Sequence, residues 1–95
     1  MIHIDVTDRQ IEIEGHAGAR GQSLPCEAVT VLVNTLVTSL DDLTADRAEY
    51  TVVPGYFKLE RKDLRASAKL LIESFLVGVR LLAGAYKEDI ELTEH

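Results

Sequence analysis

Apolar and polar residues alternate strictly along the first part of the chain. Ile2, Ile4 and Val6 are separated by polar residues, and Ile11 and Ile13 repeat the pattern after a short polar break. Successive side chains of a strand point to opposite faces of a sheet. This period of two therefore predicts a β-hairpin with one buried face and one face in water.

From about Ser23 to Leu43 the apolar residues recur at intervals of three and four, which is typical of one face of an α-helix. Ser23 is a suitable N-cap, and Pro25 suits the first turn, where a missing N–H costs little. The predicted apolar stripe comprises Val29, Leu32, Val33, Leu36, Leu40 and Leu43.

A second hairpin and a second helix follow. Residues 48–53 and 56–62 flank Pro54 and Gly55, a dipeptide that favours a turn. Asp63 is predicted to cap the next helix. Its apolar stripe comprises Leu64, Ala68, Leu71, Ile72, Phe75, Val79, Leu82 and Tyr86. Beyond Tyr86, the residues around Ile90 and Leu92 form either a short last strand or a frayed tail, and the pattern leaves both open.

Together these elements predict an α+β fold in the order ββαββα, formed as one domain by residues 1–95. A small, mostly antiparallel sheet is built from two hairpins, with room for a short C-terminal strand. Both helices are expected to pack on the same face of the sheet, because the strands have a single apolar face.

The amino-acid composition and the net charge limit the classes of function that the chain can have. Of the 95 residues, 46% are apolar and 27% charged, which is ordinary for a packed globular domain. The net charge of -6 disfavours nucleic acid and anionic membranes and favours a basic partner. Lys69, Glu73 and Arg80 interrupt the longest apolar run, so we expect a buried helix and no membrane span. A single cysteine and the polar start of the chain favour a cytoplasmic protein.

The segment GHAGARGQSLPC, residues 15–26, contains three glycines, His16 and the chain's single cysteine. Cys26 is expected in the first turn of the first helix, where the helix dipole favours an anion. The thiolate is the nucleophilic form of cysteine, and a nearby imidazole can serve as its base. This arrangement predicts a candidate Cys26–His16 pair.

Interpretations in which Cys26 and His16 are unreactive remain open. Cys26 shares a helix side with Val29 and Val33, as a buried small apolar residue would. His16 can equally be a loop histidine that caps a backbone group. The three glycines resemble a phosphate-binding loop only weakly, because no Lys-Ser or Lys-Thr follows them. His3, His16, His95 and Cys26 show no metal-ligand spacing, so no metal site is expected.

The GHA motif at 15–17, a glycine-containing loop, and Cys26 opening the helix PCEAVTVLVNTL resemble the ribosomal-processing cysteine protease family, Prp. The resemblance extends over nearly the whole chain. In that family the histidine of the motif and the cysteine form the catalytic dyad, which implies His16 and Cys26 here. Supporting or substrate-binding roles are implied for Gly15, Gly21, Ser23 and Thr30. The family usually has an aspartate at the place of Ser23 and often a serine at that of Thr30.

The resemblance implies a cysteine endopeptidase that needs no cofactor. Its substrate would be a basic precursor of a large-subunit ribosomal protein of the twenty-seven type, which loses a short N-terminal extension. A phage capsid or scaffold protein with a similar motif would be an alternative substrate. Backbone N–H groups at the helix start, including that of Cys26, would stabilise the oxyanion. The resemblance also implies a homodimer. The other interpretation is a non-catalytic dimeric homologue that binds peptides or ribosomes and carries an inert Cys26.

Overall fold

A computed structural model describes residues 1–15 and 23–95 of the chain. The elements follow one another as two strands, a helix, two strands, a helix and a last strand. They are β1 (Ile2–Val6), β2 (Gln10–Gly15), α1 (Leu24–Leu43), β3 (Tyr50–Val53), β4 (Tyr56–Glu60), α2 (Ala66–Ala85) and β5 (Ile90–Glu94).

The strands form one five-stranded sheet in the order β3-β4-β2-β1-β5. Both predicted hairpins are present, and β2 joins them by pairing with β4 in antiparallel register. The last strand is also present and pairs in parallel with β1, with Ile2 opposite Ile90. The prediction of a mostly antiparallel sheet is therefore confirmed, and the frayed-tail alternative is wrong.

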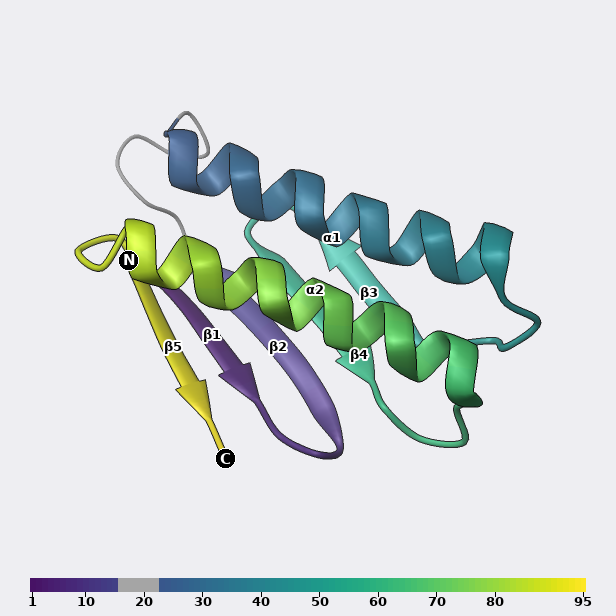
Figure 1. The fold of residues 1–95 in the computed structure, drawn as a ribbon. Helices are drawn as coiled ribbons and strands as arrows, with labels where there is room; N and C mark the ends of the chain where they lie inside the picture. Colours follow the sequence, from purple (N-terminus) through teal and green to yellow (C-terminus); the bar gives the residue numbers. More distant parts are fainter. Residues whose placement is uncertain (16–22) are drawn as a thin grey trace.

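The two helices lie side by side on one face of the sheet, as predicted (Figure 1). The strand residues that face them are buried, and the alternate residues of each strand point to the open face. The sheet contributes to the core Ile2, Ile4, Val6, Ile11, Ile13, Phe57, Leu59 and Ile90. Burial of this single apolar face is the main stabilising contribution that the alternating sequence encodes.

Helix α1 begins as predicted, with Ser23 as its N-cap and Pro25 in its first turn. One end of the predicted stripe is wrong, because Leu43 is 70% exposed, whereas Val37 is buried. A strict repeat of three and four residues drifts around a helix of 3.6 residues per turn by about 20° per heptad. Over two heptads this drift turns Leu43 away from the core and brings Val37 onto it.

The prediction that Asp63 caps α2 is wrong. Asp63 has a φ of 56°, a turn conformation that asparagine and aspartate tolerate. The N-cap is Arg65, and its backbone N–H donates a hydrogen bond to Asp46 Oδ2 at 2.7 Å. Leu64 consequently packs against the core from just before the helix, and Leu76 joins the buried stripe.

Within the described residues, neither helix has the length and apolarity needed to cross a membrane.

Candidate active site

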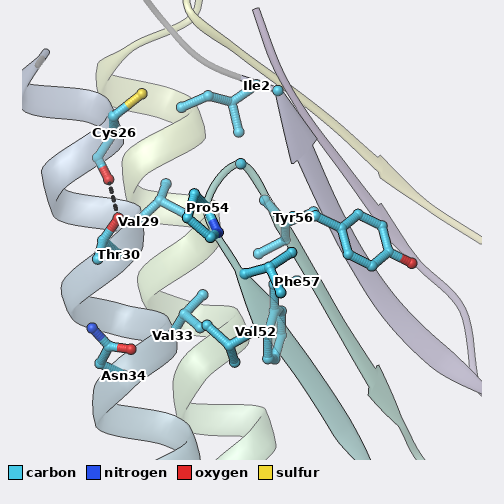
Figure 2. A pocket seen from close by; sticks show the side chains of 14 residues that line it. Ile2, Cys26, Val29, Thr30, Val33, Asn34, Val52, Pro54, Tyr56 and Phe57 are labelled. Carbon is cyan, nitrogen blue, oxygen red and sulfur yellow. Dashed lines mark hydrogen bonds between the residues drawn. The ribbon is translucent and has the colours of Figure 1, made fainter. Parts of the chain in front are cut away.

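Cys26 lies in the first turn of α1 and is held there by two neighbouring hydroxyls. Its backbone N–H donates to Ser23 Oγ at 3.3 Å, and its carbonyl oxygen accepts from Thr30 Oγ1 at 2.8 Å (Figure 2). The first bond is the usual N-cap interaction, which satisfies a donor that the helix cannot pair internally. The side chain of Cys26 is only 8% exposed, at the rim of the apolar core.

A cavity of about 510 Å³ opens beside this turn. One wall is the face of α1, and the opposite wall is the second hairpin with its Pro54–Gly55 turn (Figure 2). The lining residues are Ile2, Ile13, Gly15, Cys26, Val29, Thr30, Val33, Asn34, Val52, Val53, Pro54, Gly55, Tyr56 and Phe57. These lining residues include no aspartate, glutamate, lysine, arginine or histidine.

Gly15 closes the cavity at the end of β2. Its N–H donates to the carbonyl of Gly55 at 3.1 Å, which ties β2 to the β3–β4 turn. Its φ is 101°, and a Cβ at this position would overlap the carbonyl oxygen of Met1. Only glycine meets both demands, so the position requires glycine for structural reasons.

The predicted site residues that the structure describes lie close together. Gly15, Cys26 and Thr30 line the cavity, and Ser23 contacts Cys26 through the cap hydrogen bond. His16 and Gly21 lie outside the described residues. The grouping of Gly15 with Cys26 was expected from the sequence resemblance, and the structure adds the cavity that they share.

The hairpin wall of the cavity was not identified from the sequence. Val52, Pro54 and Phe57 face α1 across the cavity, whereas the Tyr56 ring points away from it (Figure 2). The Tyr56 hydroxyl donates to Glu12 Oε2 at 2.6 Å on the open face of the sheet, and this bond raises the pKa of Tyr56. In the sequence, only the Pro54–Gly55 dipeptide marks this wall. It predicts a turn, but neither residue has a reactive side chain.

Among residues 1–15 and 23–95, no cluster of three or more histidine, cysteine, aspartate or glutamate side chains is suited to hold a metal ion.

Comparison with known proteins identifies the fold. Two structures of the essential ribosomal processing protease Prp from S. aureus superpose with TM-scores of 0.87 and 0.89 at 21% and 23% identity, covering all of both chains. One of them contains a covalently linked product peptide and the other a substrate peptide. The protein SMU.848 from Streptococcus mutans superposes with a TM-score of 0.80 at 24% identity, covering 98% of this chain and 94% of its own. A search of curated protein sequences finds no match.

The chain is an α+β domain with a cysteine in the first turn of a helix, beside a mainly apolar cavity. The sequence matches the family described as cysteine protease Prp over residues 1–91, and the chain belongs to this family.

Proposed function

We propose that this chain is a cysteine endopeptidase in which Cys26 is the nucleophile and His16 its proton-transfer partner. The observation that carries the proposal is the position of Gly15, which lines the same cavity as Cys26. His16 is the next residue, and consecutive Cα atoms are about 3.8 Å apart. Gly15, the residue to which His16 is bonded, therefore lines the cavity that also contains the thiol.

The reaction would proceed by acyl transfer to sulfur. The Cys26 thiolate attacks the scissile carbonyl carbon, and the C–N bond breaks as the His16 imidazolium gives its proton to the leaving amine. Water then attacks the thioester with His16 as general base, releasing the new carboxylate and restoring the thiol. No cofactor takes part in these steps.

The oxyanion donors at the start of α1 are fewer than the sequence suggested. Pro25 has no N–H, and the N–H of Cys26 donates to Ser23 Oγ. For the Cys26 N–H to stabilise a tetrahedral intermediate, the Ser23 hydroxyl must release it. Ser23 therefore controls a donor that the proposed reaction uses.

The cavity suggests the substrate class. Its walls of valine, proline and phenylalanine suit an apolar side chain near the scissile bond, because such a side chain leaves water on entering. The net charge of -6 would attract a basic polypeptide. Both features suit a ribosomal protein precursor with an N-terminal extension, in keeping with the S. aureus relative being a ribosomal processing protease, or a phage capsid or scaffold protein. We also propose that the enzyme is a homodimer.

The burial of Cys26 favours one alternative function. Its side chain belongs to the core cluster together with Val29 and Val33, as expected of an inert thiol in a peptide-binding homologue. Such a protein would bind the precursor in the same cavity without cutting it.

Incubation with a panel of extended ribosomal and capsid precursors, followed by mass spectrometry, separates these functions. The parent protein should cut one precursor at a single site. Cys26→Ala should remain folded, bind the same precursor and leave it intact, while the control Thr30→Ser, which keeps a hydroxyl, should still cut. Cleavage by Cys26→Ala would exclude the cysteine mechanism, and binding without cleavage by the parent would establish the non-catalytic alternative.

A further inference from the structure

Strand β3 forms one edge of the sheet and carries no charged residue. All residues of Tyr50–Val53 are exposed, and Val52 and Val53 are 43% and 50% exposed. Edge strands of natural proteins usually carry charges or proline, which prevent pairing with another chain. The other edge strand of this sheet, β5, follows that rule with Glu91 and Glu94. The β3 edge lacks this protection and can accept a further strand.

The register of the second hairpin shows which backbone groups of β3 point away from the sheet. The N–H of Glu60 donates to the carbonyl of Glu49 at 2.9 Å, so these two residues form a hydrogen-bonded pair of the antiparallel ladder. Such pairs recur at every second residue, so Thr51 also bonds to β4. The N–H and C=O groups of Tyr50 and Val52 therefore point outward, and no described strand lies beyond them.

We propose that the β3 edge binds the substrate polypeptide as an added strand, whose main chain pairs with Tyr50 and Val52. The proposal rests on the proposed function, because it assigns a binding mode to the same substrate. An exposed sheet edge binds an extended peptide through main-chain hydrogen bonds, while pockets along the edge select its alternate side chains. Tyr50 and Val52 together offer two donors and two acceptors for this pairing.

Val52 connects the β3 edge to the cavity that contains Cys26. Its side chain lines the cavity and faces α1 (Figure 2). Residues that lie opposite each other on neighbouring strands point their side chains to the same face of the sheet. The substrate residue opposite Val52 therefore directs its side chain into the cavity. Asn34 on the facing wall is exposed, as Val52 is, so the cavity opens toward this edge.

A hydrogen bond between β3 and α1 marks the far end of the β3 edge. The Tyr50 hydroxyl donates to Asp41 Oδ2 at 2.9 Å. Asp41 lies near the end of α1, whereas Cys26 lies in its first turn. At 1.5 Å per residue, these two positions are about 22 Å apart along the helix. That length corresponds to about seven residues of extended chain, which bounds the substrate segment that lies between them.

Acidic side chains at this far end match a basic substrate. The surface hollow beside Tyr50 is lined by Asp41, Asp46 and Glu49, against Arg47 as the base. This excess of negative charge attracts a cationic side chain. The β3 edge therefore suits an extended polypeptide with an apolar residue opposite Val52 and a basic residue farther from the scissile bond.

Peptide binding by the Cys26→Ala protein tests the proposal without any cleavage. The probe is a synthetic peptide that carries the N-terminal extension of a large-subunit ribosomal protein precursor and the first residues of the mature protein. Adding Val52→Pro removes one outward N–H, which an edge strand tolerates, and should raise the dissociation constant at least about tenfold. Val52→Ala is the matched control, because it removes more of the side chain but keeps the N–H, and its effect should be much smaller.

Isothermal titration calorimetry measures these affinities, and circular dichroism verifies that each variant is folded. Equal dissociation constants for the Val52→Pro and Val52→Ala proteins would overturn the proposal, as would a peptide that does not bind. A Val52→Pro variant that loses self-association in ultracentrifugation but binds the peptide unchanged would assign the β3 edge to a second copy of the chain and would equally overturn it.

Peptides that are N-methylated at single residues test the pairing while leaving the protein unchanged. Alternate backbone groups of a strand face the same neighbour, so the loss of affinity should recur at every second position of the paired segment. Equal losses at consecutive positions, or none, would contradict an added strand. A period of two in binding, together with no cleavage by the parent, would refute the protease function and still support the proposed binding mode.

Discussion

The hydroxyl of Ser23 and the backbone N–H of Cys26 form a hydrogen bond of 3.3 Å that closes the first turn of α1. The same bond fixes the backbone of the proposed nucleophile and engages the donor that we propose for the oxyanion. An aspartate, which the family usually has here, would hold that donor more strongly because its acceptor is charged. The serine is therefore a weaker cap and a more easily released one.

Replacing Ser23 with alanine should separate these two roles. Loss of the cap should lower the free energy of unfolding by about 1 kcal/mol. The Ser23 hydroxyl then no longer competes with the proposed oxyanion for the Cys26 N–H, so kcat on the cleaved precursor should not fall. Urea unfolding and single-turnover cleavage measure the two effects, with Thr38→Ala on the exposed side of α1 as the control. A loss of kcat beyond about tenfold would mean that the hydroxyl itself takes part in the reaction.

Gly15→Ala should be strongly destabilising. The substitution imposes a side chain on a φ of 101° and drives a Cβ into the Met1 carbonyl oxygen. We expect the free energy of unfolding to fall by about 2 kcal/mol or more. Gly84→Ala is the matched control, because a Cβ there has no heavy atom within 4 Å and alanine favours a helix. Gly84→Ala should raise the free energy of unfolding by up to about 1 kcal/mol. A Gly15→Ala variant with the same melting temperature as the parent would contradict the close approach of Gly15 to Met1.

Most of the fold could be predicted from the sequence because its signals are local. The alternation of Ile2, Ile4 and Val6 and the turn at Pro54 fix the strands, and Ser23 fixes the start of α1. Asp63 was misassigned because the residue that holds the start of α2 is Asp46, which is close in space but 19 positions away from Arg65 along the chain. Such a tertiary contact leaves no pattern in the local sequence.

The sequence predicted only those parts of the candidate site that belong to a motif with a reactive residue. Cys26 was singled out by its predicted place in the first turn of a helix, and Gly15 by the family resemblance. The cavity that they share follows from packing of α1 against the second hairpin. Val52 and Phe57 are apolar residues in a strand, and nothing in the local sequence distinguishes a cavity wall from a core position. The exposed leucines of α2, Leu70 and Leu81, were not singled out in the sequence for a related reason, since the buried stripe alone accounts for the helical pattern.

The ion pair between Arg80 and Glu94 should make stability depend on pH. The hydrogen bond from Arg80 lowers the pKa of Glu94, so Glu94 stabilises the folded state above its unfolded pKa. This contribution is lost as the pH falls through the lowered pKa of the folded state. Glu94→Gln should reduce the melting temperature by about 2 °C at pH 7, in keeping with a solvent-exposed pair. The difference from the parent should vanish in acid, and a difference that persists there would assign it to packing of the side chain.

The proposed dyad can be tested without any substrate, by the rate at which iodoacetamide alkylates Cys26 across a range of pH. If the His16 imidazolium lies beside the thiol, it favours the thiolate, and alkylation should persist well below about pH 8.5, where an isolated thiol is half ionised. His16→Ala removes this charge, so the midpoint of the alkylation profile should move to higher pH while the fold is retained. His3→Ala is the matched control, because His3 lies on the open face of the sheet and pairs with Glu91 at 3.1 Å.

Cys26→Ala verifies that the chain's single cysteine is the only labelled residue. We expect the parent and His3→Ala to share one alkylation profile, and the profile of His16→Ala to lie at higher pH than both. The small size of iodoacetamide matters, since Cys26 is only 8% exposed and reacts at the rim of the cavity. A bound peptide that fills the cavity should protect the thiol in all three proteins. Coincident profiles for the parent and His16→Ala would show that the two residues do not interact in the free protein, and the catalytic pairing would then have to form on the substrate or be abandoned.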